Sequence, residues 1–408
     1  LQTRLAQQLV RYLRARGVSS HICIGGHTPT LLYEQLLAET PGLSSVVRGE
    51  GEETALELVD RLIADASLEC LPGLAFISNG YQLVNPPRAP IADLDTLPFP
   101  ARDLLKQTLA FEPVDSIPLL SSRGCYQNCA FCSIRAFYHD APNVSWRARS
   151  PKSIVDEIEQ LIDEYRIRRF NFVDDTFIGP GRRGRLRAIE FAEEVLQRKL
   201  SIEFSCGTRA DQVDTDLLCV LRKAGLTHLG LGIESGVQRV LDTLNKRITV
   251  EQNRQAILAL KESGLACEEI GFIAFDPYTT LAELRSNLEF VRELGLHRYP
   301  SNRFMRNPLM VLPRTPLEQR LLAEGRLPKP CSLADYQNNL VGYEFDDVRT
   351  GYVFQICSPL GGELTQRLER CKRFLADYDG WLRTLSQQTG QSLERIPPQI
   401  PSELREKR

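Results

Sequence analysis

A regular alternation of apolar and amphipathic segments from residue 117 to residue 312 is the feature that most constrains the fold. The apolar segments are predicted to be strands, and the longer amphipathic segments between them are predicted to be helices. The expected strands are 117–120, 169–173, 202–206, 228–233, 270–275 and 308–312. The expected helices are 153–165, 186–198, 214–223, 250–263 and 281–294. Strands that alternate with helices form parallel sheets, so this order predicts an α/β fold with a partial (β/α)6 barrel.

The first 70 residues carry a shorter version of the same alternation. The expected elements are a helix over 1–16, a strand over 21–24, a helix over 30–39, a strand over 45–48 and a helix over 54–64. This order corresponds to half of a doubly wound, Rossmann-like (flavodoxin-like) unit whose first part is missing. We therefore expect residues 1–70 to be the C-terminal part of such a domain.

Two further regions complete the expected domain organisation. Residues 71–115 are punctuated by prolines that alternate with apolar residues, which predicts a packed linker rather than a flexible tether. The barrel is expected over 116–320, and a C-terminal region over 321–408 follows it.

The composition favours an intracellular enzyme. The chain has 408 residues, 42% of them hydrophobic, and 50 basic residues balance 52 acidic ones. It can bury a sizeable core, and its charge does not indicate a nucleic-acid partner. No apolar run approaches the length of a membrane span, and the first residues lack the apolar core of a signal peptide. We expect a cytoplasmic protein without a membrane span.

Three of the eleven cysteines are clustered, at Cys125, Cys129 and Cys132. Three thiolates can hold three irons of a cubane cluster, and no fourth cysteine lies nearby, which leaves one iron open for another ligand. A structural zinc site would need a fourth ligand, for which His139 is the only nearby candidate. A disulfide would leave one of the three cysteines unpaired. The spacing favours the cluster over both alternatives.

The CxxxCxxC spacing, with an aromatic residue before the last cysteine and a strand before the first, resembles the radical S-adenosylmethionine (SAM) enzymes. The resemblance implies a [4Fe-4S] cluster whose open iron chelates SAM, and an electron that cleaves SAM to a 5'-deoxyadenosyl radical. It also implies an external electron donor such as flavodoxin or ferredoxin, and a small-molecule or peptide substrate. The C-terminal region would close the barrel mouth and select that substrate.

Polar residues follow the second, third and fourth strands of the predicted barrel, where active sites of such barrels gather. By the same resemblance, Asp174 or Asp175 would contact the SAM amino group, and Arg209 would form a paired contact to the SAM carboxylate. Glu234 and Ser235 would hold the ribose or the methionyl part.

Each of these residues also has a simpler structural interpretation. The aspartates could cap the following helix, Arg209 could pair only with Asp211, and Glu234 could be a carboxylate at a helix N-terminus. Their recurrence at successive strand ends after a cysteine triplet favours the functional interpretation.

The segments 22–26 and 46–52, together with the Leu-Pro-Phe-Pro-Ala-Arg-Asp sequence of the linker, resemble the cobalamin-dependent radical SAM enzymes. In that family the corrin lies across the carboxyl ends of the parallel strands. The resemblance makes Gly25, Gly26, His27 and Glu50 candidates for cobalamin contacts. The alternative is that the glycines form only a tight turn and that Glu50 favours a helix N-terminus.

Three functional hypotheses follow. The first is a cobalamin-dependent radical SAM methyltransferase that acts on an unactivated carbon, with the hard chemistry supplied by its cofactors. The second is a radical SAM enzyme of the same architecture that catalyses a cyclisation, oxidation or ring rearrangement. The third is a non-catalytic Fe-S redox protein, which would bind a cluster without cleaving SAM.

Overall fold

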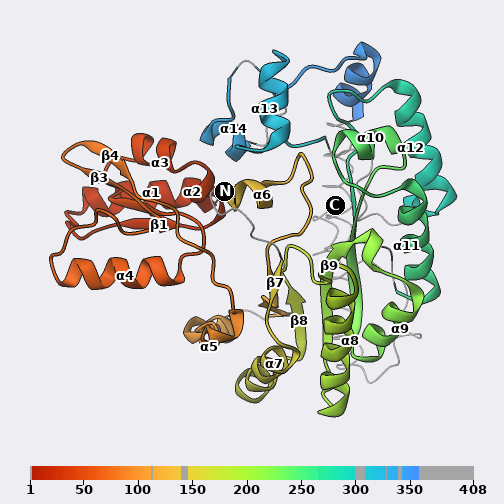
Figure 1. Ribbon diagram of the computed structural model, residues 1–408, viewed down its shortest axis with the longest axis horizontal. Coiled ribbons are helices and arrows are strands. Elements are labelled where there is room, and N and C mark those ends of the chain that lie inside the picture. The colour runs from red at the N-terminus through yellow and green to blue at the C-terminus, as the bar shows by residue number, and fades with distance from the viewer. Residues whose placement is uncertain are drawn as a thin grey trace, which may run out of the picture.

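Two lobes built on separate sheets make up the computed structural model of this protein (Figure 1). The structure describes residues 2–111, 114–138, 146–265, 267, 269–298, 308–327, 329–338 and 342–357. Part of the expected C-terminal region 321–408, including everything after residue 357, lies outside the described residues, and so does His139. Among the described residues, no helix combines the length and the apolar character needed to cross a bilayer.

The N-terminal lobe is a four-stranded sheet in the order β1-β2-β3-β4. Strands β1 and β2 are parallel, as predicted, and β3 and β4 add to them in antiparallel fashion. The elements are α1 (Gln2–Ala15), β1 (Cys23–Gly25), α2 (His27–Leu31), α3 (Tyr33–Glu39), β2 (Ser45–Val47), α4 (Glu52–Ile63), β3 (Leu74–Ser78) and β4 (Tyr81–Val84). The single helix expected over 30–39 is instead α2 and α3, which are separated at Leu32.

The β3–β4 hairpin differs from the expectation that residues 71–115 form only a linker. Ser78 pairs with Tyr81, so Asn79 and Gly80 form a two-residue turn, with φ of 50° and 82°. Positive φ at both central residues is the geometry that Asn-Gly favours in tight hairpins. The rest of this stretch contains the short 3-10 helix η1 (Leu94–Thr96) and helix α5 (Asp103–Phe111).

The second lobe is a five-stranded parallel sheet in the order β11-β10-β9-β8-β5. The strands are β5 (Ile117–Leu119), β8 (Arg169–Phe172), β9 (Glu203–Arg209), β10 (Leu226–Glu234) and β11 (Ile270–Phe272). The sixth expected strand, 308–312, is present only as a parallel bridge between Phe275 and Pro308. A short antiparallel ladder joins β6 (Ser122–Arg123) to β7 (Arg147–Ala148).

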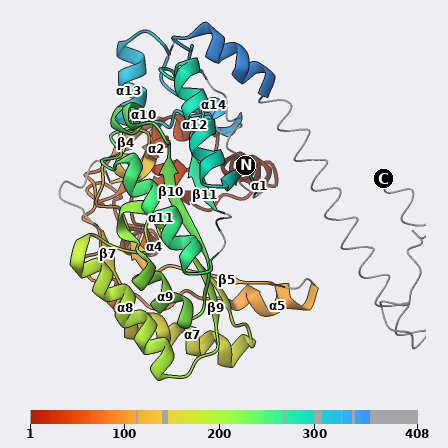
Figure 2. The ribbon, with the colours of Figure 1, turned by 90° about the vertical axis from the view of Figure 1, so that its right-hand side faces the viewer.

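Helices cover one face of this sheet (Figures 1 and 2). They are α7 (Pro151–Tyr165), α8 (Gly181–Gln197), α9 (Thr215–Lys223), α11 (Val250–Glu262) and α12 (Leu281–Glu293). Shorter elements are α6 (Ser133–Phe137), η2 (Ala210–Gln212), α10 (Gln238–Thr243), η3 (Leu296–Arg298), α13 (Pro316–Ala323) and α14 (Leu333–Asn338). Local sequence fixes their starts: the Ser150 side chain caps α7, and Thr249 and Thr280 form capping boxes at α11 and α12.

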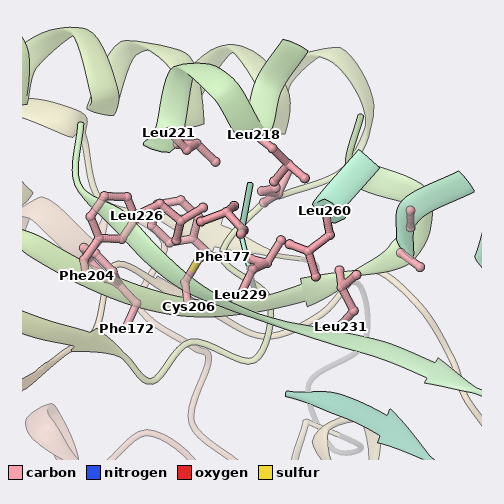
Figure 3. Close-up of a cluster of buried hydrophobic side chains, with 14 of the residues drawn as sticks. Phe172, Phe177, Phe204, Cys206, Leu218, Leu221, Leu226, Leu229, Leu231 and Leu260 are labelled. Atoms are coloured by element: carbon pink, nitrogen blue, oxygen red, sulfur yellow. The ribbon is translucent and has the colours of Figure 1, made fainter. Parts of the chain in front are cut away.

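The main core lies between the sheet and these helices, as Figure 3 shows. Alternate residues of β9, among them Phe204 and Cys206, point into it. The intervening residues Ser205 and Gly207 are partly exposed on the opposite face of the sheet. Because side chains alternate along a strand, the helices cover one face and leave the other face to line a cavity.

Candidate functional site

The three clustered cysteines lie in an irregular segment between β6 and α6, which we call the cysteine loop (residues 124–132). Cys125, Cys129 and Cys132 line a cavity of about 580 Å³ together with the C-terminal halves of β9 and β10 and the start of β11. All three are free thiols. Among the described residues, no three His, Cys, Asp or Glu side chains converge on the position of a single metal ion. Three thiols around one cavity are the donor set that a cubane cluster with one open iron requires.

Burial disfavours the thiolate form of Cys129 and Cys132. It raises the pKa of Cys132 to about 12 and also raises the pKa of Cys129, although the positive charges of Lys246 and Arg209 act in the opposite direction on Cys129. The ligating form of cysteine is the thiolate, so the binding of iron at this site would release protons.

The two predicted aspartates have different surroundings. Asp174 accepts hydrogen bonds from the Ser121 amide (2.7 Å) and the Ser122 hydroxyl (2.9 Å), and it does not line the cavity. Asp175 lines the cavity and accepts a hydrogen bond from the Gly124 amide at 2.9 Å. Asp174 therefore organises the strand end that leads to the cysteine loop. Of the two aspartates, only Asp175 lines the cavity in which a ligand would bind.

Glu234 is the last residue of β10, lies at a bulge, and has a φ of 62°. A left-handed backbone is unfavourable for a residue with a side chain, so the surroundings must enforce it. The buried Asn253 amide donates to the carbonyls on both sides, of Ile233 (2.9 Å) and Ser235 (3.0 Å). This turn places the Glu234 side chain on the cavity wall.

Lys246 is a cavity residue that sequence reasoning missed. Its Nζ donates to Glu234 Oε1 at 2.8 Å, and the two side chains are 6% and 11% exposed. It follows α10 in a polar loop, where no local pattern distinguishes it from a surface lysine. Only the packing of that loop against β10 brings its charge into the cavity.

Arg209 lines the cavity, but most of its guanidinium already has partners. Its Nε lies 2.9 Å from Asp211 Oδ1, its Nη2 lies 3.2 Å from Asp211 Oδ2, and Nη2 also donates to the Lys246 carbonyl at 2.9 Å. The remaining Nη1 lies 3.9 Å from Cys129 Sγ. The paired contact of Arg209 to a ligand carboxylate stays a prediction, and in this geometry Asp211 occupies one edge of the guanidinium fork. Nη1 faces the cavity and can donate a single hydrogen bond to a ligand.

Ser235 does not reach the cavity. It is fully buried, its hydroxyl donates to Asn287 Oδ1 at 3.0 Å, and its oxygen accepts from the Val237 amide at 3.1 Å. Its role is to hold the turn after β10, so its predicted ligand contact is not supported by its position.

Bare backbone forms much of the cavity wall, which sequence reasoning also missed. Gly207 pairs with Gly230, and Gly232 pairs with Gly271, across neighbouring strands. All four line the cavity. A side chain at Gly232 would meet Lys246 Nζ at 2.9 Å and Glu234 Oε1 at 3.0 Å. Glycine therefore keeps room for the charged pair at this point.

The candidates for cobalamin contacts lie at the carboxyl ends of β1 and β2. Gly25 and Gly26 are exposed, and Gly26 has a φ of 105°. His27 and Glu50 already have partners in the second lobe: His27 Nε2 lies 2.9 Å from Ser133 Oγ, and Glu50 pairs with Arg147 at 2.6 Å. Both side chains are therefore part of the junction between the lobes.

Comparison with known proteins identifies the family. The family model described as "Radical SAM superfamily" matches residues 119–291, which run from the last residue of β5 through the cysteine loop and β11 to α12. The chain belongs to the radical SAM superfamily. This confirms the predicted resemblance of the cysteine motif to the radical SAM enzymes.

Two curated relatives align with this chain over more residues than the family model does. The chain is 36% identical over 256 residues to the anaerobic magnesium-protoporphyrin IX monomethyl ester cyclase of Rubrivivax gelatinosus, which covers 60% of this chain and 44% of the relative. It is 31% identical over 278 residues to an uncharacterized methyltransferase of Pyrococcus horikoshii, which covers 67% of this chain and 58% of the relative. The chain thus spans about half the length of these relatives.

The fold of this radical SAM protein is similar to that of a solved cobalamin-dependent member. The structure of OxsB with aqua-cobalamin and S-adenosylmethionine bound has a TM-score of 0.68 and 22% sequence identity, and the match covers 87% of this chain and 55% of OxsB. The predicted α/β fold, with a partial barrel preceded by part of a cobalamin-binding type of domain, is confirmed by this likeness.

Proposed function

We propose that this protein reductively cleaves S-adenosylmethionine at a [4Fe-4S] cluster held by Cys125, Cys129 and Cys132. The observation that carries the proposal is that three free thiols from one short loop line the same cavity. When bound, the cluster supplies the electron that breaks a carbon–sulfur bond of SAM. The protein holds the cluster, orients SAM and excludes water.

The charges around the cavity suit a ligand that carries both an amino group and a carboxylate. Lys246 has one protein partner for its three N–H donors within the described chain, so it has donors available for a carboxylate, and Arg209 Nη1 can add a second contact. The carboxylates of Glu234 and Asp175 lie on the same cavity and suit the amino group. We propose these four residues as the SAM-binding set.

Replacement of each cluster ligand tests the first proposal. Cys125→Ala, Cys129→Ala and Cys132→Ala should each abolish production of 5'-deoxyadenosine by the anaerobically reconstituted protein, because cluster assembly needs all three thiolates. Cys219→Ala, on α9 and outside the cavity, is the control and should keep full activity. Full iron, sulfide and 5'-deoxyadenosine in any one of the three variants would contradict the assignment, and so would a wild-type protein that assembles the cluster without cleaving SAM.

We also propose that the complete protein binds cobalamin at the carboxyl ends of β1 and β2. The likeness to OxsB and the exposed turn at Gly25 and Gly26 support this. A corrin held there beside the barrel would bring its reactive centre near the substrate. The test is to incubate the complete protein with hydroxocobalamin and to measure corrin absorbance after desalting. One corrin per chain is expected, and its absence would overturn this proposal while leaving SAM cleavage intact.

For the transformation we propose methyl transfer to an unactivated carbon, which the likeness to the methyltransferase of Pyrococcus horikoshii supports. The second candidate is ring formation on a porphyrin ester, which the 36% identity to the magnesium-protoporphyrin cyclase favours. Incubation with methyl-labelled SAM and magnesium-protoporphyrin IX monomethyl ester separates them. Label in a carbon–methyl product supports the first candidate, whereas a cyclised porphyrin without label supports the second.

Three features of the organisation remain proposals. We propose that the first domain extends through β4 to Val84, because the hairpin completes its sheet, and that the linker begins after it. We propose a barrel domain over 116–320 and a C-terminal region over 321–408 that selects the substrate. A flavodoxin- or ferredoxin-type reductant would supply the electron.

A further inference from the structure

The upstream end of the cysteine loop is attached to the N-terminal lobe by an ion network. Arg123 immediately precedes the loop and contacts the carboxylate of Glu52, and its Nη1 lies 3.6 Å from Glu50 Oε2. Arg147 stands directly opposite Arg123 on the β6–β7 ladder. Like charges in that position repel each other, and an acidic side chain that contacts both arginines offsets this repulsion.

Glu50 is that partner. Its side chain is only 6% exposed, and its Oε1 lies 2.6 Å from Arg147 Nη2. It also accepts hydrogen bonds from the Tyr138 hydroxyl (3.1 Å) and from the Ile91 amide of the linker (2.8 Å). One carboxylate at the end of β2 thus binds the linker, the ladder that leads into the cysteine loop, and the residue that follows α6.

The downstream end of the cysteine loop is attached to the same lobe by His27. Helix α6 begins directly after Cys132, and His27 Nε2 lies 2.9 Å from Ser133 Oγ. The His27 ring stacks on Phe137 with a centroid distance of 5.0 Å and an interplanar angle of 5°. Ala136, on the same helix, is buried in the core of the N-terminal lobe.

The middle of the cysteine loop is held by the barrel instead. The Ala130 amide donates to the Leu244 carbonyl at 2.8 Å, and the Asn245 side chain donates to the Asn128 carbonyl at 2.6 Å. The loop is irregular, and most of its described hydrogen bonds join it to other elements rather than connect two residues of the loop. Its shape therefore depends on both lobes.

We propose that Glu50 and His27 are positioning residues that clamp the two ends of the cysteine loop and thereby set the arrangement of the three thiols around the cavity. A buried ion network is weak evidence for net stability, but it can specify one geometry among several. The proposal concerns the chain's own contacts, so it does not depend on whether the N-terminal lobe holds a corrin or which reaction the enzyme catalyses.

Glu50→Gln and His27→Ala in the complete protein test the proposal. Gln keeps the shape of the side chain but removes the negative charge that attracts both Arg123 and Arg147. Glu53→Gln is the control for Glu50, because it lies on the first turn of α4, is 58% exposed and pairs with Arg88 at 3.3 Å. His21→Ala is the control for His27, because the His21 ring makes its hydrogen bond to Ser45, within the N-terminal lobe.

Two readouts report on the loop itself. The first is amide hydrogen exchange of peptides covering 121–138 in the cluster-free protein, compared with peptides covering β9 and β10. The second is the electron paramagnetic resonance spectrum of the reduced cluster, with and without SAM. We expect at least tenfold faster exchange over 121–138 in Glu50→Gln and His27→Ala, with unchanged exchange in β9 and β10. We also expect a broadened or shifted spectrum at retained iron content, and no change in either control.

A role limited to stability would lower the melting temperature without moving either readout. Unchanged exchange over 121–138 and an unchanged spectrum in both variants would therefore overturn the proposal. If Glu50→Gln does not fold, the half-buried His27→Ala decides by the same two readouts.

Discussion

Replacement of Lys246 by methionine would leave a carboxylate in the cavity wall without its counter-charge. Methionine keeps the length and lack of branching of the lysine side chain, so the main change is the loss of the ammonium group. Lys246 Nζ and Glu234 Oε1 are 2.8 Å apart, and both side chains are almost completely buried. Removal of one partner from such a pair costs about 3–5 kcal/mol of folding free energy.

That loss lowers the equilibrium constant for folding by about 100-fold to 10,000-fold. An exposed pair of similar geometry should behave differently. Lys152 Nζ lies 2.7 Å from Asp156, but the lysine side chain is 75% exposed. Lys152→Met should therefore cost less than about 1 kcal/mol. Urea unfolding followed by the fluorescence of Trp146, which is buried in the barrel lobe, compares the two variants.

A double substitution separates the charge effect from a packing effect. Glu234→Gln in the Lys246→Met background removes the stranded charge, so Lys246→Met/Glu234→Gln should recover most of the lost stability. If the double variant is no more stable than Lys246→Met alone, or if Lys152→Met is equally damaging, the reasoning from burial is refuted.

Three further perturbations have expected outcomes. Asp174→Asn should lower the stability of the barrel lobe by about 1–3 kcal/mol in urea unfolding, because an amide accepts fewer of the hydrogen bonds from Ser121 and Ser122; unchanged stability would show that these bonds are dispensable. Phe204→Ala should cost about 3–5 kcal/mol in the same assay, because Phe204 is 1% exposed and packs against three other phenylalanines; a loss below about 1 kcal/mol would contradict this packing. Burial lowers the pKa of His27, so the unfolded chain takes up the proton more readily and stability is lost as the pH falls below about 6.5. Melting temperatures between pH 7.5 and pH 5.5 should therefore fall less steeply for His27→Gln than for the wild type, and equal slopes would exclude a contribution from His27.

Local patterns were sufficient for most of the fold. The helices α7, α9, α11 and α12 begin within two residues of their predicted starts, because their caps and apolar faces are encoded within each segment. The order of strands in the barrel follows from their alternation with helices. The β3–β4 hairpin was not predicted, although Asn79-Gly80 is a strong local signal for a tight turn. The prolines that follow it favour a linker over the whole of 71–115.

Within the site, the sequence by itself determined the clustered cysteines, because their chemistry depends on spacing along one short segment. It could not distinguish Asp174 from Asp175, since only the packing of neighbouring strands decides which carboxylate meets Ser121 and which meets Gly124. The tertiary structure alone brought Lys246 to Glu234, because a buried ion pair is made by segments that fold from different parts of the chain. The tertiary structure also decided that Glu50 contacts the second lobe, because a buried carboxylate needs cationic partners. Those partners, Arg123 and Arg147, are about 70 to 100 residues away along the chain.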